Sequence, residues 1–297
     1  MSSTPLKILS GDHESVVSTA VVTEPRMSEA DVVRWATGLE VLPGSTLAPP
    51  VAVEGPGRPV LEKVPGPRFD ARVQDRSVTV RQLRHVGLAL ATLHTTAPPA
   101  DHPVTVESLP WDPLPLRVWA GLSSEQRRLT GALHRDAALR QRGREAHAAL
   151  AERGVWCHGD ARTNNIVLSG GLPLFIDWEC AGLGRPEGDL GSLCGSLITD
   201  TLVLSEAPAG AEAHAELRAS IDRATGQIRQ VLAAYRHGNR QGLDAELLGS
   251  AVGCGLLARA LMQAAQSGRE RVAMALYRLG RGLVLDPGRW KAIDAHA

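Results

Sequence analysis

The sequence predicts an α+β protein with two lobes, a small N-terminal lobe of strands with one helix and a larger, mainly helical C-terminal lobe. The chain has 297 residues, which is enough for two hydrophobic cores. Short apolar and β-branched runs precede residue 64, and apolar residues recur at helical spacing from about residue 70. We therefore assign the N-terminal lobe to residues 1–64 and the C-terminal lobe to residues 65–297.

The N-terminal lobe contains three predicted features. The run VVSTAVV at 16–22 is β-branched and apolar, as a buried strand is. Ser28 is a candidate N-cap, because acidic residues in the next turn suit the positive end of a helix. The stretch at 44–67 has two apolar runs separated by Pro and Gly, which predicts a hairpin.

The C-terminal lobe begins with a helix over 83–93 that stops before Pro98. Ser123 and Gln126 form a capping box that opens one long helix. Short strands and loops follow at 155–190, with Gly182 and Gly184 permitting a tight turn. Further helices are predicted at about 211–236, 244–266 and 269–284.

Composition excludes several classes of partner. The formal net charge is zero, so no global field attracts nucleic acid or an anionic membrane. The four cysteines have neither metal-site nor disulfide spacing, which indicates reduced thiols. The first residues lack the apolar core of a signal peptide, and no apolar run reaches the roughly 20 residues of a membrane span. We expect a soluble, cytoplasmic protein.

Polar residues with a chemical role gather between residues 156 and 190. Asp160 lies in a loop five residues before Asn165, and Asp177 ends the next strand but one. A hairpin turning at 169–171 would bring Asn165 and Asp177 to the same end of two neighbouring strands. Carboxylate and amide oxygens suit Mg²⁺. Phosphoryl transfer uses a carboxylate that accepts the proton of the acceptor hydroxyl and a neighbouring metal site that holds the phosphates.

At these residues the chain resembles the aminoglycoside phosphotransferase family, relatives of the protein kinases. The H-G-D-x-x-x-x-N and D-W-E motifs of that family, and its later D-L, are matched at 158–165, 177–179 and 189–190. Weaker likeness extends upstream over 29–35, 60–66 and 88–94. The resemblance implies a bilobal, protein-kinase-like fold with the active site in the cleft.

The resemblance also implies a role for each matched residue. Asp160 would be the catalytic base, supported structurally by His158. Asn165 and Asp177 would bind magnesium, and Asp189 would brace the catalytic loop through its backbone.

Other implied roles concern the nucleotide. Glu62, Lys63 and Val64 would meet the adenine through main-chain groups, and Glu29 would pair with a lysine that holds the phosphates. Arg162 is either a contact to substrate or phosphate, or a solvated loop arginine.

The sequence departs from the family in its first thirty residues. No lysine lies between Gly11 and Ser28, and the expected position falls near Thr23. The segment that should hold a glycine-rich loop, 10–13, contains one glycine. Arg26 carries a positive charge nearby, although we expect it in a turn outside the cleft.

We therefore expect transfer of the γ-phosphoryl group of ATP or GTP to a hydroxyl. The acceptor is either a small hydroxylated molecule, such as an antibiotic, or Ser/Thr of a precursor peptide acted on later by a partner lyase. Residues 177–184 and 279–287 resemble kinase-like enzymes of lanthipeptide and thioamide-peptide biosynthesis, which phosphorylate such Ser or Thr residues. A third hypothesis is a pseudokinase that binds nucleotide or peptide and scaffolds a partner enzyme.

Overall fold

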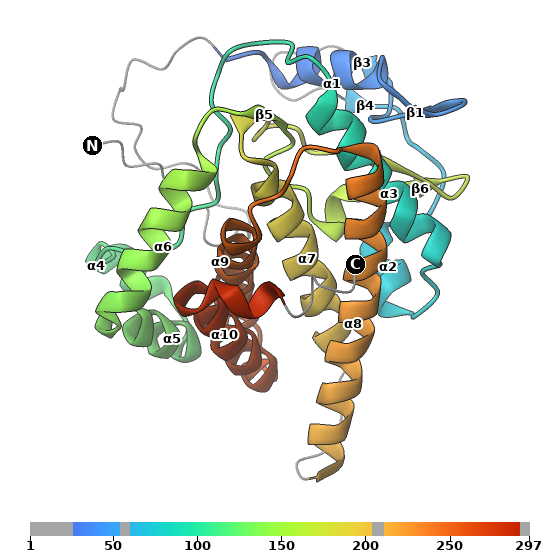
Figure 1. Ribbon diagram of the computed structural model, residues 1–297. Helices are drawn as coiled ribbons and strands as arrows, with labels where there is room; N and C mark the ends of the chain where they lie inside the picture. The colour runs from blue at the N-terminus through green and yellow to red at the C-terminus, as the bar shows by residue number, and fades with distance from the viewer. Residues whose placement is uncertain (1–25, 54–59, 204–210, 292–297) are drawn as a thin grey trace.

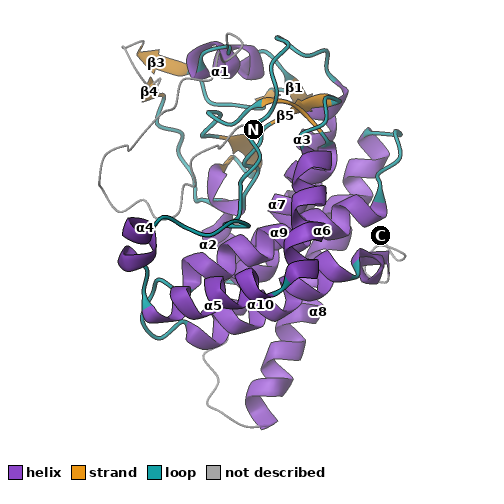
Figure 2. Ribbon diagram, turned by 90° about the vertical axis from the view of Figure 1, so that its left-hand side faces the viewer, coloured by secondary structure: helices purple, strands orange, loops and turns teal. Residues whose placement is uncertain are grey.

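The structure is a computed structural model that describes residues 26–53, 60–203 and 211–291. Strands gather at one end of the molecule and long helices fill the remainder (Figures 1 and 2), so the predicted α+β class is confirmed. The described helices are α1 (Glu29–Thr37), α2 (Phe69–Gln74), α3 (Val80–Thr95), α4 (Leu116–Gly121), α5 (Ser124–Arg135), α6 (Ala137–Leu150), α7 (Pro186–Val203), α8 (Ala211–Gly238), α9 (Ala245–Gln263) and α10 (Glu270–Leu285), with 3₁₀ turns η1 (Thr163–Asn165) and η2 (Pro287–Trp290). The described strands are β1 (Glu40–Leu42), β2 (Ser45–Thr46), β3 (Val51–Val53), β4 (Val60–Leu61), β5 (Val155–Cys157), β6 (Ile166–Ser169), β7 (Leu172–Phe175) and β8 (Gly182–Gly184).

The N-terminal part consists of α1 and two antiparallel strand pairs. Ser28 caps α1 by accepting a hydrogen bond from the amide of Asp31, as predicted. Strands β3 and β4 pair across the predicted hairpin, and β1 pairs with β2 ahead of them. The predicted strand at 16–22 and the segment at 10–13 lie outside the described residues. The lobe boundary at residue 64 stays a prediction.

Hydrogen bonds join this part and the residues just after it to the β6–β7 hairpin. The amide of Phe175 in β7 donates to the carbonyl of Leu47 (2.7 Å), and the amide of Leu168 in β6 donates to that of Pro67 (2.9 Å). Trp35 of α1 meets Trp156 of β5 edge to face, with ring centroids 5.9 Å apart. The β6–β7 hairpin therefore carries the candidate metal ligands directly beneath the N-terminal strands.

The long helix predicted after Ser123 is in fact two helices. Ser123 and Gln126 do form the capping box that starts α5. The chain then leaves helical geometry at Asp136, whose carboxylate caps α6 by accepting from the amide of Leu139 (3.0 Å) and binds Arg281 on α10. This N-cap and its arginine partner favour the break over a continuous helix.

Helix α9 lies at the centre of the helical part. Among the described helices it alone is long and apolar enough to cross a membrane, but 61% of that apolar window is buried inside the protein. It packs against α7 and α10, and Leu256 and Leu257 on it are almost fully buried. Its apolar composition is therefore explained by its position in the core of the fold.

The expected turn at Gly182 and Gly184 is wrong, because these residues form β8, which pairs antiparallel with β5. A Cβ at Gly182 would lie 2.5 Å from the backbone of Pro103, and one at Gly184 would lie 2.5 Å from Val104. Glycine is required here because another segment crosses the strand closely. In contrast, Gly170 and Gly171 have positive φ values of 56° and 83° and form the predicted turn between β6 and β7.

Candidate active site

The catalytic loop runs from the end of β5 to the start of β6 and holds Asp160. The Oδ2 atom of Asp160 accepts hydrogen bonds from Arg162 (Nη2, 2.5 Å) and Asn165 (Nδ2, 2.9 Å). Asn165 also donates to the carbonyl of Asp160 (3.0 Å). These contacts fix one carboxylate oxygen, while Oδ1 has no hydrogen-bond partner among the described residues. The sequence spacing of five residues therefore brings the Asp160 carboxylate and the Asn165 side-chain amide into direct contact.

His158 is fully buried and joins this loop to the strand before Asp177. Its Nε2 lies 3.0 Å from the carbonyl of Ile176, and its Nδ1 accepts from the amide of Asp160 (3.2 Å). Burial lowers the pKa of the imidazole, which favours the neutral form with the proton on Nε2. The ring also packs on Trp178, with centroids 4.4 Å apart. These contacts agree with the role that the resemblance implies for His158, which is to hold the loop of Asp160 in position.

Asp189 on α7 holds the backbone of the same loop. Its two oxygens accept hydrogen bonds from the amides of His158 (2.7 Å) and Gly159 (2.8 Å), and Oδ2 also lies 3.0 Å from His94 Nε2. Burial by itself would raise the pKa of Asp189, but the hydrogen bond and charge of His94, together with His158, outweigh it and the pKa is lowered. A buried carboxylate with this many donors forms a rigid anchor for the loop.

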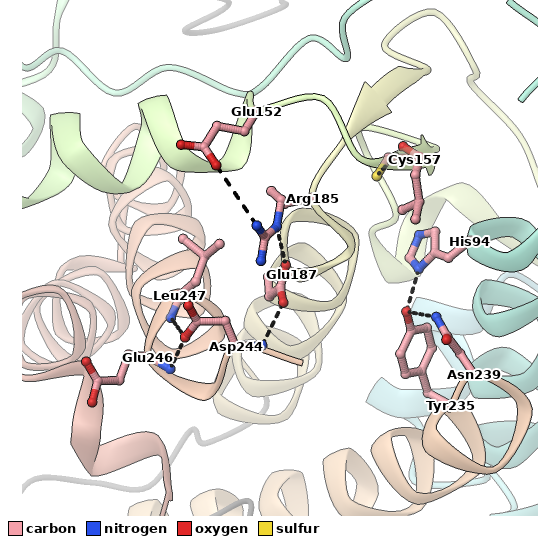
Figure 3. A network of polar contacts seen from close by, with 11 residues as sticks. His94, Glu152, Cys157, Arg185, Glu187, Tyr235, Asn239, Asp244, Glu246 and Leu247 are labelled. Carbon is pink, nitrogen blue, oxygen red and sulfur yellow. Dashed lines mark hydrogen bonds and ion pairs between the residues drawn. The ribbon is translucent and has the colours of Figure 1, made fainter. Parts of the chain in front are cut away.

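The sequence did not predict the hydrogen-bonded residues that hold the side chain of Asp189 in place. His94 on α3 contacts the hydroxyl of Tyr235 on α8 (3.0 Å), and Asn239 donates to the same hydroxyl (2.9 Å), as Figure 3 shows. His94 is the last residue of the segment 88–94 that resembles the family, so this resemblance could have marked it as a site residue. Tyr235 follows His94 by 141 positions, and nothing in the local sequence links the two.

His94, Cys157 and Asp189 present donor atoms within 4.8 Å of one another. However, hydrogen bonds already engage both ring nitrogens of His94 and both oxygens of Asp189. Burial raises the pKa of the Cys157 thiol well above its ordinary value, so it is a packed thiol. We assign no metal to this cluster.

Asn165 and Asp177 lie at the same end of the β6–β7 pair, as the hairpin pattern predicted. The amide of Ile176, the residue before Asp177, donates to the carbonyl of Asn165 (2.9 Å). Asp177 has a φ of +66°, an uncommon value for a residue with a side chain and one that is found at functional sites. Because the Asn165 NH₂ group faces Asp160, its amide oxygen is directed elsewhere. A carboxylate and an amide oxygen on adjacent strand ends fit the oxygen ligands of Mg²⁺.

The predicted nucleotide contacts lie on the opposite lobe. Glu62 and Lys63 are exposed, Val64 is half-buried, and the amide of Glu62 donates to the carbonyl of Pro50 (2.8 Å). That amide is therefore already used within the lobe. Glu29 is half-buried in the first turn of α1. The expected lysine position near Thr23 is outside the described residues.

Arg26, which the sequence predicts to lie in a turn outside the cleft, contacts two distant segments of the chain. Its guanidinium donates to the hydroxyl of Thr105 (2.7 Å) and to the carbonyl of Ala181 (3.2 Å). Ala181 follows Asp177 by four residues. Arg26 therefore bridges the start of α1 to the segment that follows Asp177.

An open cavity lies next to Asp160. Its walls are the catalytic loop at Gly159 and Asp160, the loop 104–107, the first two turns of α7, and one face of α9. Arg185, at the edge of this cavity, contacts Glu187 (3.3 Å) and Glu152 (4.0 Å).

A network of polar contacts around the buried Glu187 joins the elements on this side of the cavity (Figure 3). Glu187 accepts the amide of Asp244 (2.8 Å), and Asp244 caps the N-terminus of α9. Arg185, Glu187 and Asp244 thereby connect the beginnings of the two helices that form the wall. None of these residues was a candidate from the sequence.

Several solved structures of kinases are similar to this chain. A choline/ethanolamine kinase family protein from Mesorhizobium loti is 16% identical, with a TM-score of 0.42 over 80% of this chain and 79% of that one. A glucosamine kinase is 19% identical, with a TM-score of 0.47 over 83% and 67% of the two chains. An amicoumacin kinase in complex with AMP-PNP, Ca²⁺ and Ami is 15% identical, with a TM-score of 0.40 over 76% and 64%. No curated protein matches the sequence.

The family model described as "Phosphotransferase enzyme family" matches residues 18–241, about three quarters of the chain. That range includes every candidate catalytic residue, from Glu29 to Asp189. The motif residues therefore occur in a chain that matches the family over both lobes. The chain belongs to the phosphotransferase enzyme family and is a kinase-like phosphotransferase.

Proposed function

We propose that this protein transfers the γ-phosphoryl group of ATP or GTP to a hydroxyl of a small molecule bound in the cavity beside Asp160. The observation that carries the proposal is the position of Asp160 on the cavity wall, with one oxygen held by Arg162 and Asn165 and the other without a described partner. Such a carboxylate is oriented to accept a proton from a molecule in the cavity.

In the proposed step the acceptor oxygen attacks the γ-phosphorus. The new O–P bond forms as the bond from phosphorus to the β–γ bridging oxygen breaks, and that oxygen leaves on the nucleoside diphosphate. The hydroxyl proton passes to Asp160 and then to solvent. Arg162 holds the carboxylate in position, and Asp189 holds the loop that carries it.

Asn165 and Asp177 are the residues that would hold Mg²⁺. When bound, the metal would neutralise charge on the phosphates. The nucleotide would lie under the N-terminal strands, with the main chain of Lys63 and Val64 facing the base. The four free cysteines support a reducing, cytoplasmic setting for this reaction.

Two other interpretations are distinguished by product. A serine or threonine of a precursor peptide would give a phosphopeptide, which a partner lyase could then convert. A pseudokinase would bind nucleotide without turnover. The retained set of Asp160, Asn165 and Asp177 supports an enzyme, because a scaffold needs no base.

The test is nucleotide turnover in Asp160→Asn. We expect ADP or GDP release to fall by about 10²–10⁴, which is the usual effect of removing a general base, with nucleotide affinity nearly unchanged. Asp112→Asn is a matched control, because that side chain is 79% exposed and pairs with Arg144 at the surface. Equal turnover in Asp160→Asn and the parent would refute the assignment of Asp160.

A further inference from the structure

Helix α7 contacts the catalytic loop at two places along one face. Near its N-terminal end Asp189 holds the first part of the loop through two backbone amides. Seven and eleven residues further along, Ser196 and Asp200 lie on the same face of the helix. Both contact the loop at the 3₁₀ turn η1, which ends at the proposed metal ligand Asn165.

Thr163, the first residue of η1, makes this second contact through both its backbone and its side chain. It is buried, its amide donates to the hydroxyl of Ser196 (3.1 Å), and its own hydroxyl donates to Oδ2 of Asp200 (2.5 Å). Ser196 is fixed in turn, because its hydroxyl donates to the carbonyl of Leu193 (2.8 Å). Two hydrogen bonds from one residue therefore hold η1 against α7.

Asp200 also connects the loop to a third element. Its Oδ1 accepts a hydrogen bond from the side-chain amide of Gln74 at the end of α2 (3.2 Å). Just before α2, the carbonyl of Pro67 accepts from the amide of Leu168 in β6. Asp200 thus joins α7, η1 and α2, and the chain before α2 is bound to the strand that follows Asn165.

The position of Asp200 is unfavourable for its charged form. Both of its donors are uncharged, and burial raises the pKa of Asp200 to about 6, so the fold disfavours the carboxylate near neutral pH. Residues that lower stability in this way are expected where they serve a functional site. The element that Asp200 serves is the turn that carries Asn165.

The geometry of η1 determines where Asn165 lies. The amide of Asn165 donates to the carbonyl of Arg162 (2.9 Å), and the amide of Ile166 donates to the carbonyl of Thr163. The side chain of Asn165 in turn contacts Asp160 (2.9 Å). A displacement of Thr163 would therefore reach both the proposed metal ligand and the proposed base.

We propose that Asp200 is a positioning residue that acts through Thr163 to place Asn165 for metal binding. Asp200 itself contacts neither metal nor substrate. It holds η1 in the geometry that sets Asn165 at the same strand end as Asp177. The inference rests on the proposed function, because it concerns the metal ligands of that same site.

The first measurement is amide hydrogen exchange of the segment 160–166 in the ligand-free protein. Asp200→Ala and Thr163→Val each remove one partner of the hydrogen bond, and each should speed exchange of this segment at least about fivefold. Helix α9 should exchange as in the parent, which excludes global unfolding as the cause. Thr201→Val is the matched control, because its buried hydroxyl donates within α7, to the carbonyl of Leu197 (2.7 Å), and it should leave the segment unchanged.

The second measurement is the gain in ATP affinity that Mg²⁺ provides, from calorimetric titrations with and without the metal. We expect Asp200→Ala and Thr163→Val to reduce this gain at least about tenfold, which is the usual effect of removing a residue that orients a metal ligand. Thr201→Val should keep the gain of the parent.

Two further variants test whether the effect comes from this hydrogen bond. Asp200→Asn should recover roughly half of the lost gain on a logarithmic scale, because its side chain can still accept from Gln74 and donate to the Thr163 hydroxyl. The double variant Asp200→Ala/Thr163→Val should bind no more weakly than either single variant, since both changes remove the same contact.

Failure of this inference differs from failure of the proposed function. Unchanged loop exchange, or an unchanged Mg²⁺ gain in Asp200→Ala and Thr163→Val, would overturn the positioning role and leave the phosphotransferase in place. Additive losses in the double variant, no recovery in Asp200→Asn, or an equal loss in Thr201→Val would do the same. If the parent gains no ATP affinity from Mg²⁺ and Asp160→Asn turns over nucleotide as the parent does, the proposed function is wrong and the positioning role is wrong with it.

Discussion

Asp200 gives a pH dependence of stability whose size can be worked out from its surroundings. This residue of α7 accepts hydrogen bonds from the hydroxyl of Thr163 (2.5 Å) and the amide of Gln74 (3.2 Å). Burial raises its pKa from 3.8 to about 6, although both hydrogen bonds act in the opposite direction. The folded protein therefore binds this proton more tightly than the unfolded chain does.

The sign follows from that difference. Below about pH 4 the carboxyl is protonated in both states, and its stabilising contribution is fully present. As pH rises towards 6 the unfolded chain releases the proton first, so the contribution is lost and is absent above the folded pKa. Since one pKa unit corresponds to about 1.4 kcal/mol, the change from 3.8 to about 6 is worth up to about 3 kcal/mol of unfolding free energy.

Asp200→Asn should remove this dependence. The asparagine keeps the shape of the neutral carboxyl, with its oxygen accepting from Gln74 and its NH₂ donating to the hydroxyl of Thr163. We expect the unfolding free energy of the variant, relative to the parent, to rise by up to about 3 kcal/mol between pH 4 and pH 7. Urea unfolding at four pH values in this range measures it. Asp112→Asn should show no such trend, because Asp112 is exposed.

A difference between Asp200→Asn and the parent that stays constant from pH 4 to pH 7 would refute the reasoning. It would mean that the folded and unfolded chains bind the Asp200 proton equally well. Burial would then not disfavour the charged form of the Asp200 carboxyl in the folded protein.

Two further predictions concern packing and metal binding. Gly182→Ala should destabilise the fold by about 1–3 kcal/mol, because its Cβ would lie 2.5 Å from the facing backbone, whereas Gly242→Ala, with nothing within 4 Å, should unfold at the same urea concentration as the parent. Similar midpoints for the two variants would contradict that account. Asp177→Ala should make nucleotide affinity nearly independent of Mg²⁺, because it removes a charged oxygen ligand. Calorimetric titration of ATP with and without Mg²⁺ checks it, and an unchanged metal dependence would exclude Asp177 from the metal site.

Local sequence was sufficient for features set by short-range geometry. The capping box at Ser123 and the N-cap at Ser28 depend on residues within one turn, and both are present. The hairpin that brings Asn165 beside Asp177 depends on two glycines in the turn and on strand alternation. The residues of each pattern lie within fifteen positions of one another, so each feature can be predicted from the sequence without the fold.

Local reading failed where a distant segment determines the outcome. The helix after Ser123 breaks at Asp136, where Arg281 of α10 binds the capping carboxylate. Gly182 is a strand residue whose lack of a side chain is required by the crossing chain at Pro103. In both cases the deciding partner is far away along the chain.

The sequence motif alone predicted phosphoryl transfer, because Asp160, Asn165 and Asp177 stand at the intervals that such chemistry needs. Only the tertiary structure revealed the support of Asp189 by His94 and Tyr235, and the small residues of α9 that form one wall of the cavity. A chemical motif is local because the reacting groups share one loop and one hairpin. Anchors and cavity walls are assembled from helices that meet only when the chain folds.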